Sequence, residues 1–201
     1  AGYRGALTAE TSFTGTADAG RLTAKATGSR LAIGQTEADR LLAGETQLSA
    51  DLDLADGQIR IKSAQISNPQ LRADAKGTVA GNQRQIDLTA EIVNLATVLP
   101  PFPGRLAIIG KAVDNGQGYA LDLGLRGPGG IDTTVKGRVA PGFGNADLAI
   151  TGGAEAGLAN VFISPTTISG RLRYDLRLKG PLALTSLSGP ITLGGLRIAA
   201  P

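Results

Sequence analysis

The sequence predicts an all-β fold built on a long antiparallel sheet, and two patterns carry this prediction. Apolar and polar residues alternate with a period of two along most of the 201 residues, as in strands that have one apolar and one polar side. Gly, Asn, Asp and Pro gather between these runs, as expected for the tight turns of an antiparallel sheet. The clearest run is residues 168–179, where Ile, Leu and Tyr share one parity and Ser, Arg, Asp and Lys share the other.

Six shorter runs of the same kind precede this segment. We expect strands at residues 22–26, 48–54, 71–75, 86–92, 119–125 and 146–150. The turn signals in the chain are Asp56-Gly57, Gly81-Asn82, Asn115-Gly116, Gly127-Pro128-Gly129-Gly130 and Gly194-Gly195. Short strands with regularly spaced turns indicate an antiparallel, all-β architecture.

Three stretches break the alternation, and each predicts a short helix. Residues 36–44 begin with Thr36 as a candidate N-cap, carry acidic residues early and close on a Gly, which together predict a two-turn helix. Residues 92–99 run into a proline-rich stretch that would stop a helix. Residues 154–162 are followed by Ser164-Pro165.

The breaks recur at the same place in a longer unit, which indicates an imperfect internal repeat. The segment LRADAKG at residues 71–77 aligns with IDTTVKG at residues 131–137, and both units resume with Gly-Arg-Leu, at residues 104–106 and 170–172. A fainter first copy begins near residue 22. The approximate repeat units are 20–70, 71–130 and 131–198, with chance similarity in Gly-, Ala- and Leu-rich β sequence as the alternative.

The composition excludes several classes of function. The chain has no Cys and no His, so it has no thiolate nucleophile, no Ser-His dyad, no disulfide and no ordinary zinc site. Aromatic residues make up 3% of the chain and Trp is absent, which leaves little surface for stacking bases or sugars. The net charge is only +3, and the basic residues are scattered, which argues against nucleic acid as a partner. We therefore expect no catalytic residues, no metal and no cofactor.

The start of the chain and the length of its apolar runs indicate how it could be related to a membrane. No stretch approaches the roughly 20 apolar residues of a membrane-spanning helix, and no signal-peptide pattern is present. The chain begins with Ala rather than Met. We therefore expect a fragment of a longer protein, with any membrane anchor outside it.

Local patterns that could suggest chemistry have simpler explanations. Asp51, Asp53 and Asp56 lack the sixth-position Gly and terminal Glu of a calcium loop, and the first two share the outward parity of a strand. The Gly-rich segments do not precede the Lys-Ser/Thr of a phosphate-binding loop. The basic residues of the run 168–179 are interrupted by Asp175, so we interpret them as a solubilising outer face.

The apolar rows must be covered by something, and the sequence leaves two arrangements open. They can form the closed core of a β-sandwich, or they can line an apolar trough in a long sheet that is folded along its length. Large aromatic residues, which would fill a core, are scarce, and this favours the trough modestly. The candidate lining residues are Leu48, Leu52, Leu54, Ile59, Ile61, Leu71, Ile86, Leu88, Ile92, Leu106, Ile108, Tyr119, Leu121, Leu123, Leu125, Ile131, Val135, Leu148, Ile150, Leu172, Tyr174, Leu176, Leu178, Ile191 and Leu193.

The sequence of the last strands resembles a known family. Residues 168–180 (ISGRLRYDLRLKG) and 187–198 (LSGPITLGGLRI) closely resemble the repeats of the TamB family, and residues 92–106 look like the short helix and restart of those repeats. The resemblance covers most of residues 20–198 and rests on repeat texture, without a catalytic signature. TamB-like proteins of Gram-negative bacteria have an inner-membrane anchor and a long periplasmic β-structure with an apolar interior.

The resemblance implies both a fold and a function. It implies that residues 1–201 are one fragment of a periplasmic β-taco, or repeating β-groove, in which an antiparallel sheet is curled into a groove with short helices between repeat units. It implies phospholipid acyl chains as partners, in lipid transport to the outer membrane or in outer-membrane protein assembly. A BamA-like outer-membrane partner, TamA, would be contacted through parts of the chain not present here. The alternative is a structural or adhesive closed β-sandwich or solenoid domain without a lipid ligand.

Overall fold

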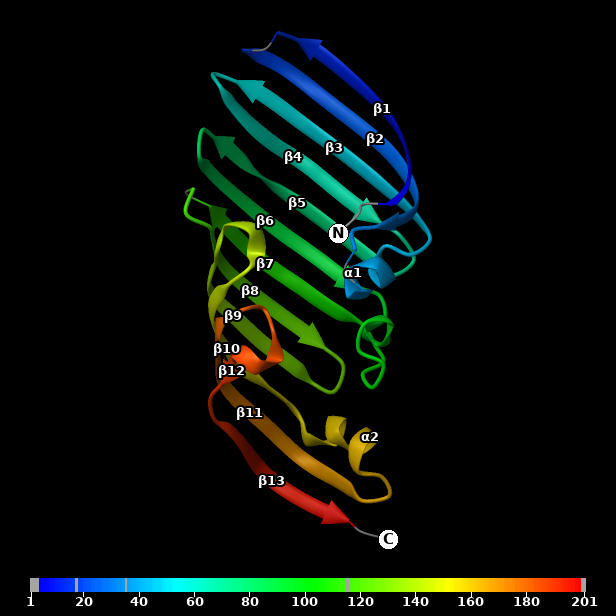
Figure 1. Cartoon of the computed structure of the whole chain (residues 1–201), viewed down its shortest axis with the longest axis vertical. Helices are drawn as coiled ribbons and strands as arrows, with labels where there is room; N and C mark the ends of the chain where they lie inside the picture. The colour runs from blue at the N-terminus through cyan, green and yellow to red at the C-terminus, as the bar shows by residue number, and fades with distance from the viewer. Residues whose placement is uncertain (1–3, 17, 35, 115, 200–201) are drawn as a thin grey trace.

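Thirteen strands form one antiparallel sheet in the computed structural model, which describes residues 4–16, 18–34, 36–114 and 116–199 (Figure 1). The strands are β1 (Arg4–Gly15), β2 (Ala19–Ala32), β3 (Glu45–Ala55), β4 (Gln58–Ser67), β5 (Leu71–Ala80), β6 (Gln83–Ile92), β7 (Leu106–Asp114), β8 (Tyr119–Gly127), β9 (Ile131–Val139), β10 (Ala146–Glu155), β11 (Thr167–Gly180), β12 (Leu187–Ser188) and β13 (Ile191–Ala199). The helical segments are α1 (Thr36–Leu41), η1 (Leu95–Thr97), η2 (Pro141–Phe143), η3 (Ala156–Ala159), α2 (Asn160–Ile163) and η4 (Leu184–Ser186). The prediction of an all-β, antiparallel fold is confirmed.

The sheet follows the order of the chain. Each strand from β1 to β11 pairs with the next, and β12 and β13 both pair with β11. The Asp56-Gly57 turn between β3 and β4 has φ values of 51° and 70°, the left-handed values that a tight hairpin turn requires. The sheet does not close on itself, because β1 pairs only with β2 and β13 only with β11.

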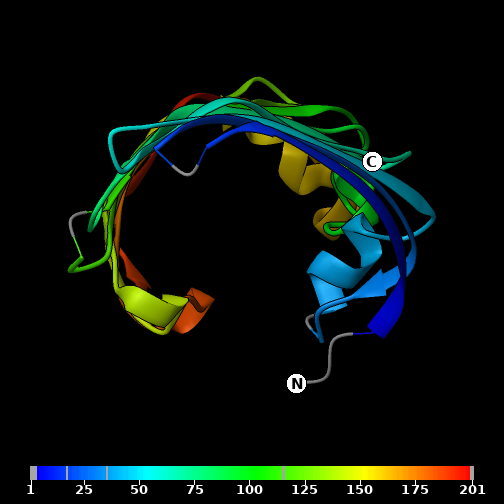
Figure 2. The same cartoon turned by 90° about the horizontal axis from the view of Figure 1, so that it is seen from above.

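Seen along its long axis, the sheet follows an open arc (Figure 2). Two glycines of the repeated Lys-Gly pair bring neighbouring backbones unusually close inside this arc. A Cβ atom on Gly77 would lie 2.0 Å from the carbonyl oxygen of Gln85, and one on Gly137 would lie 2.1 Å from that of Asp147. No other residue fits at these positions unless the adjacent strand moves away.

Helical segments follow β2, β6 and β10, at intervals of four strands, and they lie on the inner side of the arc (Figure 2). The helix expected at residues 36–44 is present in a shorter form as α1, which ends at Leu41. The one expected at residues 92–99 is reduced to the single 3-10 turn η1, because Ile92 still pairs with Leu71 and Leu106 as the last residue of β6. Likewise, Glu155 ends β10 opposite Arg171, so the helical segment begins only at η3.

One predicted turn is wrong, and one is only partly described. Gly194 and Gly195 lie inside β13, where the pairing with β11 shifts register opposite Gly170 and Gly195 has a φ of 63°. The pair marks a β-bulge, in which an extra residue is accommodated without ending the strand. Of the predicted turn Asn115-Gly116, Asn115 lies outside the described residues.

In the described part of the chain, buried apolar residues form two small clusters instead of one continuous core. The first cluster is Ile92, Leu95 and Leu106. The residues that pack against it come from α1, from the segment after η1 and from β5, β7 and β8: Leu41, Val98, Phe102, Leu71, Ile108 and Leu125. The second cluster is Val139, Ala146 and Leu148, surrounded by half-buried aliphatic residues of β8–β11. Among the described residues, no helix has the length and apolar character that crossing a bilayer would require.

Candidate functional site

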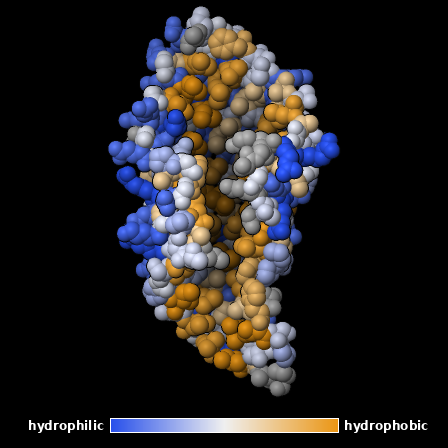
Figure 3. Space-filling view, in the orientation of Figure 1, coloured by the Kyte–Doolittle hydropathy of each residue, from blue (hydrophilic) through white to orange (hydrophobic). Residues whose placement is uncertain are grey.

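The inner side of the arc, here called the concave face, carries the apolar residues of almost every strand. Cross-strand partners and residues two apart along a strand share a face, so the pairing register assigns each side chain to one of the two faces. All 25 candidate lining residues fall on the concave face by this criterion. Figure 3 shows an apolar band along this face between polar margins.

One row of this face shows how its character changes along the sheet. Each member pairs with the next, so the row crosses ten strands at one level. From β2 to β11 it reads Ala24, Ala50, Ala64, Ala75, Leu88, Gly110, Leu123, Val135, Ile150 and Leu176. Four consecutive strands therefore contribute a methyl group where four later strands contribute a branched side chain.

The alanine part of the row borders a depression of about 500 Å³ over β2–β6. Ala26 and Ala73 of the neighbouring row continue its floor, and Leu48, Ile66 and Leu88 add larger aliphatic side chains. The polar residues Ser49, Gln65 and Asp74 also border it. Its accessible surface is almost entirely apolar. A volume of this size is typical of sites for small ligands.

The opposite end of the concave face is filled by its own side chains. Leu121, Val135, Ile150 and Leu178 pack around the second cluster. No comparable cluster of buried apolar residues forms over the described parts of β2–β4.

A tyrosine on β11 reaches across β10 on this face. Thr133, Gly152 and Tyr174 are successive partners on β9, β10 and β11. The Thr133 hydroxyl and the Tyr174 hydroxyl are hydrogen-bonded to each other across the glycine. Because Gly152 has no side chain, the phenol can lie over β10 with its polar group satisfied.

The buried Asn68 fixes the helix that follows β2. Its side-chain nitrogen donates to the carbonyl oxygen of Leu41 at 2.8 Å and to the Thr46 hydroxyl at 3.2 Å, while its Oδ1 accepts from the backbone N–H of Leu71 at 2.7 Å. Asn94 similarly accepts from the backbone of Ala96 and Gly104. Sequence reasoning missed these asparagines, although Asn beside a turn is a common signal for such bonds.

The concave face also carries one ion pair, Arg84 of β6 with Asp114 of β7, whose Nη1 and Oδ2 atoms are 2.6 Å apart. The backbone N–H of Gly116 donates to the other carboxylate oxygen, Oδ1, at 2.8 Å. These hydrogen bonds, that from Gly116 first, lower the pKa of Asp114. The carboxylate is therefore ionised at neutral pH.

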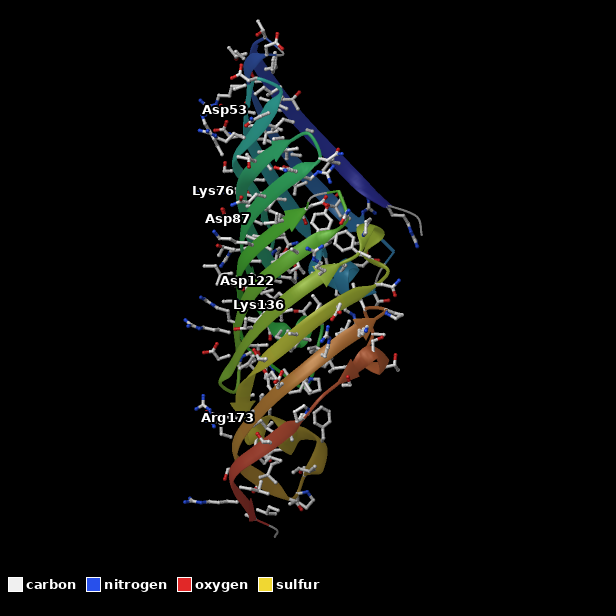
Figure 4. The ribbon with its side chains drawn as sticks, turned by 90° about the vertical axis from the view of Figure 1, so that its left-hand side faces the viewer. Asp53, Lys76, Asp87, Asp122, Lys136 and Arg173 are labelled. Atoms are coloured by element: carbon white, nitrogen blue, oxygen red, sulfur yellow. The ribbon has the colours of Figure 1, made fainter. Side chains whose placement is uncertain are left out.

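The outer, convex face is a lattice of opposite charges. Lys76, Asp87, Lys111, Asp122 and Lys136 are successive cross-strand partners on β5–β9. Four of these side chains are labelled where they project from the outer side of the sheet in Figure 4. The charges of this row alternate in sign, so over the described residues of β5–β9 the row forms no continuous basic surface of the kind that binds nucleic acid.

Of the acidic residues singled out in the sequence, Asp51 and Asp53 lie on this face, whereas Asp56 lies in the turn between β3 and β4. Asp51 accepts hydrogen bonds from Arg21 at 2.6 and 2.8 Å, which lower its pKa, and Asp53 lies 2.8 Å from Lys62. Arg177 of the basic stripe binds Asp147 in the same bidentate way. In the part of the chain that the structure describes, no three acidic side chains come close enough to hold a metal ion.

Compared with known proteins, the chain matches no family model, no curated protein and no solved structure. A function must therefore be inferred from the geometry of the concave and convex faces.

Proposed function

We propose that the concave face is the wall of an apolar groove that shields phospholipid acyl chains from water, within a TamB-like segment of a bacterial envelope protein. The observation that carries this proposal is the aliphatic concave face, over which only short helical segments lie among the described residues (Figure 2). Leu48, Ile66 and Leu88 remain half-exposed on it, around the depression. Monomeric proteins rarely leave an apolar surface of this extent uncovered.

The hydrophobic effect suffices for such a function. Each methylene group removed from water contributes about 0.8 kcal/mol, so a dozen of them would supply roughly 10 kcal/mol. Such binding requires no catalytic residue and no cofactor, which agrees with the composition. The convex charge lattice would keep the outside of the groove hydrated.

The resemblance of the sequence to the TamB family suggests where in the cell such a groove would work. In a TamB-like protein the groove would lie in the periplasm, anchored to the inner membrane and joined to a TamA-like outer-membrane partner through other parts of the chain. Phospholipid transport to the outer membrane would be its task.

Support of outer-membrane protein assembly is a second candidate, which the two free edges of the sheet favour. All residues of β1 and β13 are exposed, and an unpaired strand edge can take up a further strand.

Lipid mass spectrometry on the purified protein tests the proposal. Ala50 lies in the floor of the depression, whereas Ala149 of β10 faces the convex side and does not line the depression. We expect phospholipid to co-purify with the unaltered chain and with Ala149→Asp, and to be lost from Ala50→Asp, because an acyl chain in the depression would remove water from the new carboxylate. Circular dichroism checks that all three proteins retain their strands.

A purely structural role predicts a different result. In that case no lipid co-purifies with any of the three proteins, and a fluorescent apolar probe does not bind at a fixed stoichiometry. Either finding for the folded, unaltered chain would refute the groove proposal.

A further inference from the structure

The ion pair on the concave face is unusual because of its surroundings. In the concave-face rows of β3–β11, Arg84 and Asp114 are the only charged side chains. Their neighbours at the same level of the sheet include Val79 and Tyr119. Charges on an otherwise apolar surface need a reason, because placing them there costs free energy unless they are paired.

The two partners are unequally exposed. The Asp114 side chain retains 6% of its exposure, whereas that of Arg84 retains 46%. Both carboxylate oxygens of Asp114 are occupied, by Arg84 and by the backbone N–H of Gly116. A guanidinium has five N–H donors, and Arg84 directs one of them to Asp114. Among the described residues, the buried carboxylate thus holds a cation whose side chain stays 46% exposed, so that a ligand can reach it.

Arg84 is aligned with the depression. It lies on β6 on the same face as Ile86 and Leu88, and Leu88 lines the depression. Four residues along a strand span about 13 Å. Gly77, the partner of Ile86 on β5, adds no side chain between them. The surface between Arg84 and the depression is therefore apolar, and β5 places no side chain beside Ile86 that would block it.

We propose that Arg84 binds the phosphate of an anionic amphiphile whose hydrocarbon chain lies in the depression lined by Ala50, Ala64 and Ala75. This inference rests on the proposed function and adds a headgroup to it. A guanidinium fits phosphate oxygens through paired, charge-assisted hydrogen bonds. Asp114 acts as a positioning residue, because it fixes the guanidinium without contacting the ligand. The site distinguishes phosphate-bearing chains from neutral chains of equal length.

Binding of two amphiphiles with the same chain tests the proposal. Dodecyl phosphate and dodecanol compete for the protein against a fluorescent apolar probe. For the unaltered chain we expect dodecyl phosphate to bind roughly tenfold more tightly, the effect of a charge-assisted hydrogen bond. Arg84→Gln should bind both equally. Arg21→Gln is the matched control, because it breaks a convex-face ion pair of the same 2.6 Å length, and it should keep the preference.

The possible outcomes separate the two proposals. If neither amphiphile displaces the probe, the apolar groove itself is wrong. If both bind equally to the unaltered chain, the headgroup site is wrong and the groove stands. Inorganic phosphate alone should not displace the probe; displacement at the same concentration would mean a site for free phosphate and overturn the proposal.

A spectroscopic measurement covers the case in which Arg84→Gln fails to fold. The side-chain Nε–H resonance of Arg84 should shift in the NMR spectrum of the unaltered chain when dodecyl phosphate is added, and should stay in place with dodecanol. An unmoved resonance at saturating dodecyl phosphate would overturn the assignment to this residue.

Discussion

The two halves of the concave face share one backbone plan but differ in the size of their side chains. Over β2–β5 one row presents four alanines, and the depression lies above them. Over β8–β11 the same row presents Leu123, Val135, Ile150 and Leu176, and the second cluster is buried among these strands. Both halves pair antiparallel with one apolar side, although a register shift interrupts the alternation in β4. Side-chain volume therefore decides whether a stretch of the sheet fills its inner surface or leaves it open.

This difference separates stability from binding within one sheet. The C-terminal half has the better buried residues, so it should contribute more of the free energy of folding. The N-terminal half leaves apolar surface uncovered, which contributes little to folding but remains available to a ligand. Substitutions that change side-chain size in either half can test whether the C-terminal half contributes mainly to stability and the N-terminal half mainly to binding.

The largest expected effect is on stability, from removing a leucine in each half. Leu148 of the second cluster retains 6% of its exposure, so Leu148→Ala should cost about 3 kcal/mol through lost burial and the cavity left behind. Leu48 borders the open depression and is half-exposed, so Leu48→Ala should cost about 1 kcal/mol. Urea denaturation followed by circular dichroism measures both. Equal losses would show that the halves do not differ in the way proposed.

A smaller effect is expected on binding, from filling the depression. Ala64→Leu gives β4 the side chain that β8 already has at this level. It should lower the affinity for an apolar probe about tenfold, because about two ligand methylenes lose their contacts at 0.8 kcal/mol each. Ala149 of β10 faces the convex side, so Ala149→Leu is the control and should leave binding unchanged. Unaltered probe affinity in Ala64→Leu would place the ligand elsewhere.

The sequence was sufficient to assign side chains to faces, because a strand has a strict period of two. Alternation alone placed residues as distant as Leu48 and Leu193 on one surface. Arg84 shares this parity with Ile86 and Leu88 in β6. The apolar run that predicts the strand begins only at Ile86, so it does not reach Arg84.

The open and filled halves could not be predicted, because they depend on pairing between strands. The alanine row exists only if Ala50 and Ala64 are partners, and a register shift in β4 near Lys62 makes them so. The sequence likewise does not show at which glycines neighbouring strands approach too closely for a side chain, as they do at Gly77. Gly195 shows the reverse problem, since a glycine at a bulge and a glycine at a turn have the same local sequence signal.

The smallest expected effect compares a carboxylate on each face as the pH falls. The pKa of Asp114 is lowered first by the Gly116 N–H, and that of Asp51 first by Arg21. Because both values are lower in the folded chain, each carboxylate stabilises it above about pH 4, the ordinary Asp pKa, and this stabilisation is lost as the pH falls through the folded value. The buried Asp114 is bonded to backbone, so its contribution should survive high salt, whereas the half-exposed Asp51–Arg21 pair should be screened.

Urea midpoints measured between pH 3 and pH 7 would separate the two carboxylates. At about 0.05 M salt, both Asp114→Asn and Asp51→Asn should flatten the acid limb of the stability curve relative to the unaltered chain. At about 1 M salt only Asp114→Asn should still do so, since the Debye length has fallen to about 3 Å. If Asp51→Asn keeps its effect at high salt, the Asp51–Arg21 pair is not screened by salt. The proposed difference between the carboxylates of the two faces would then be wrong.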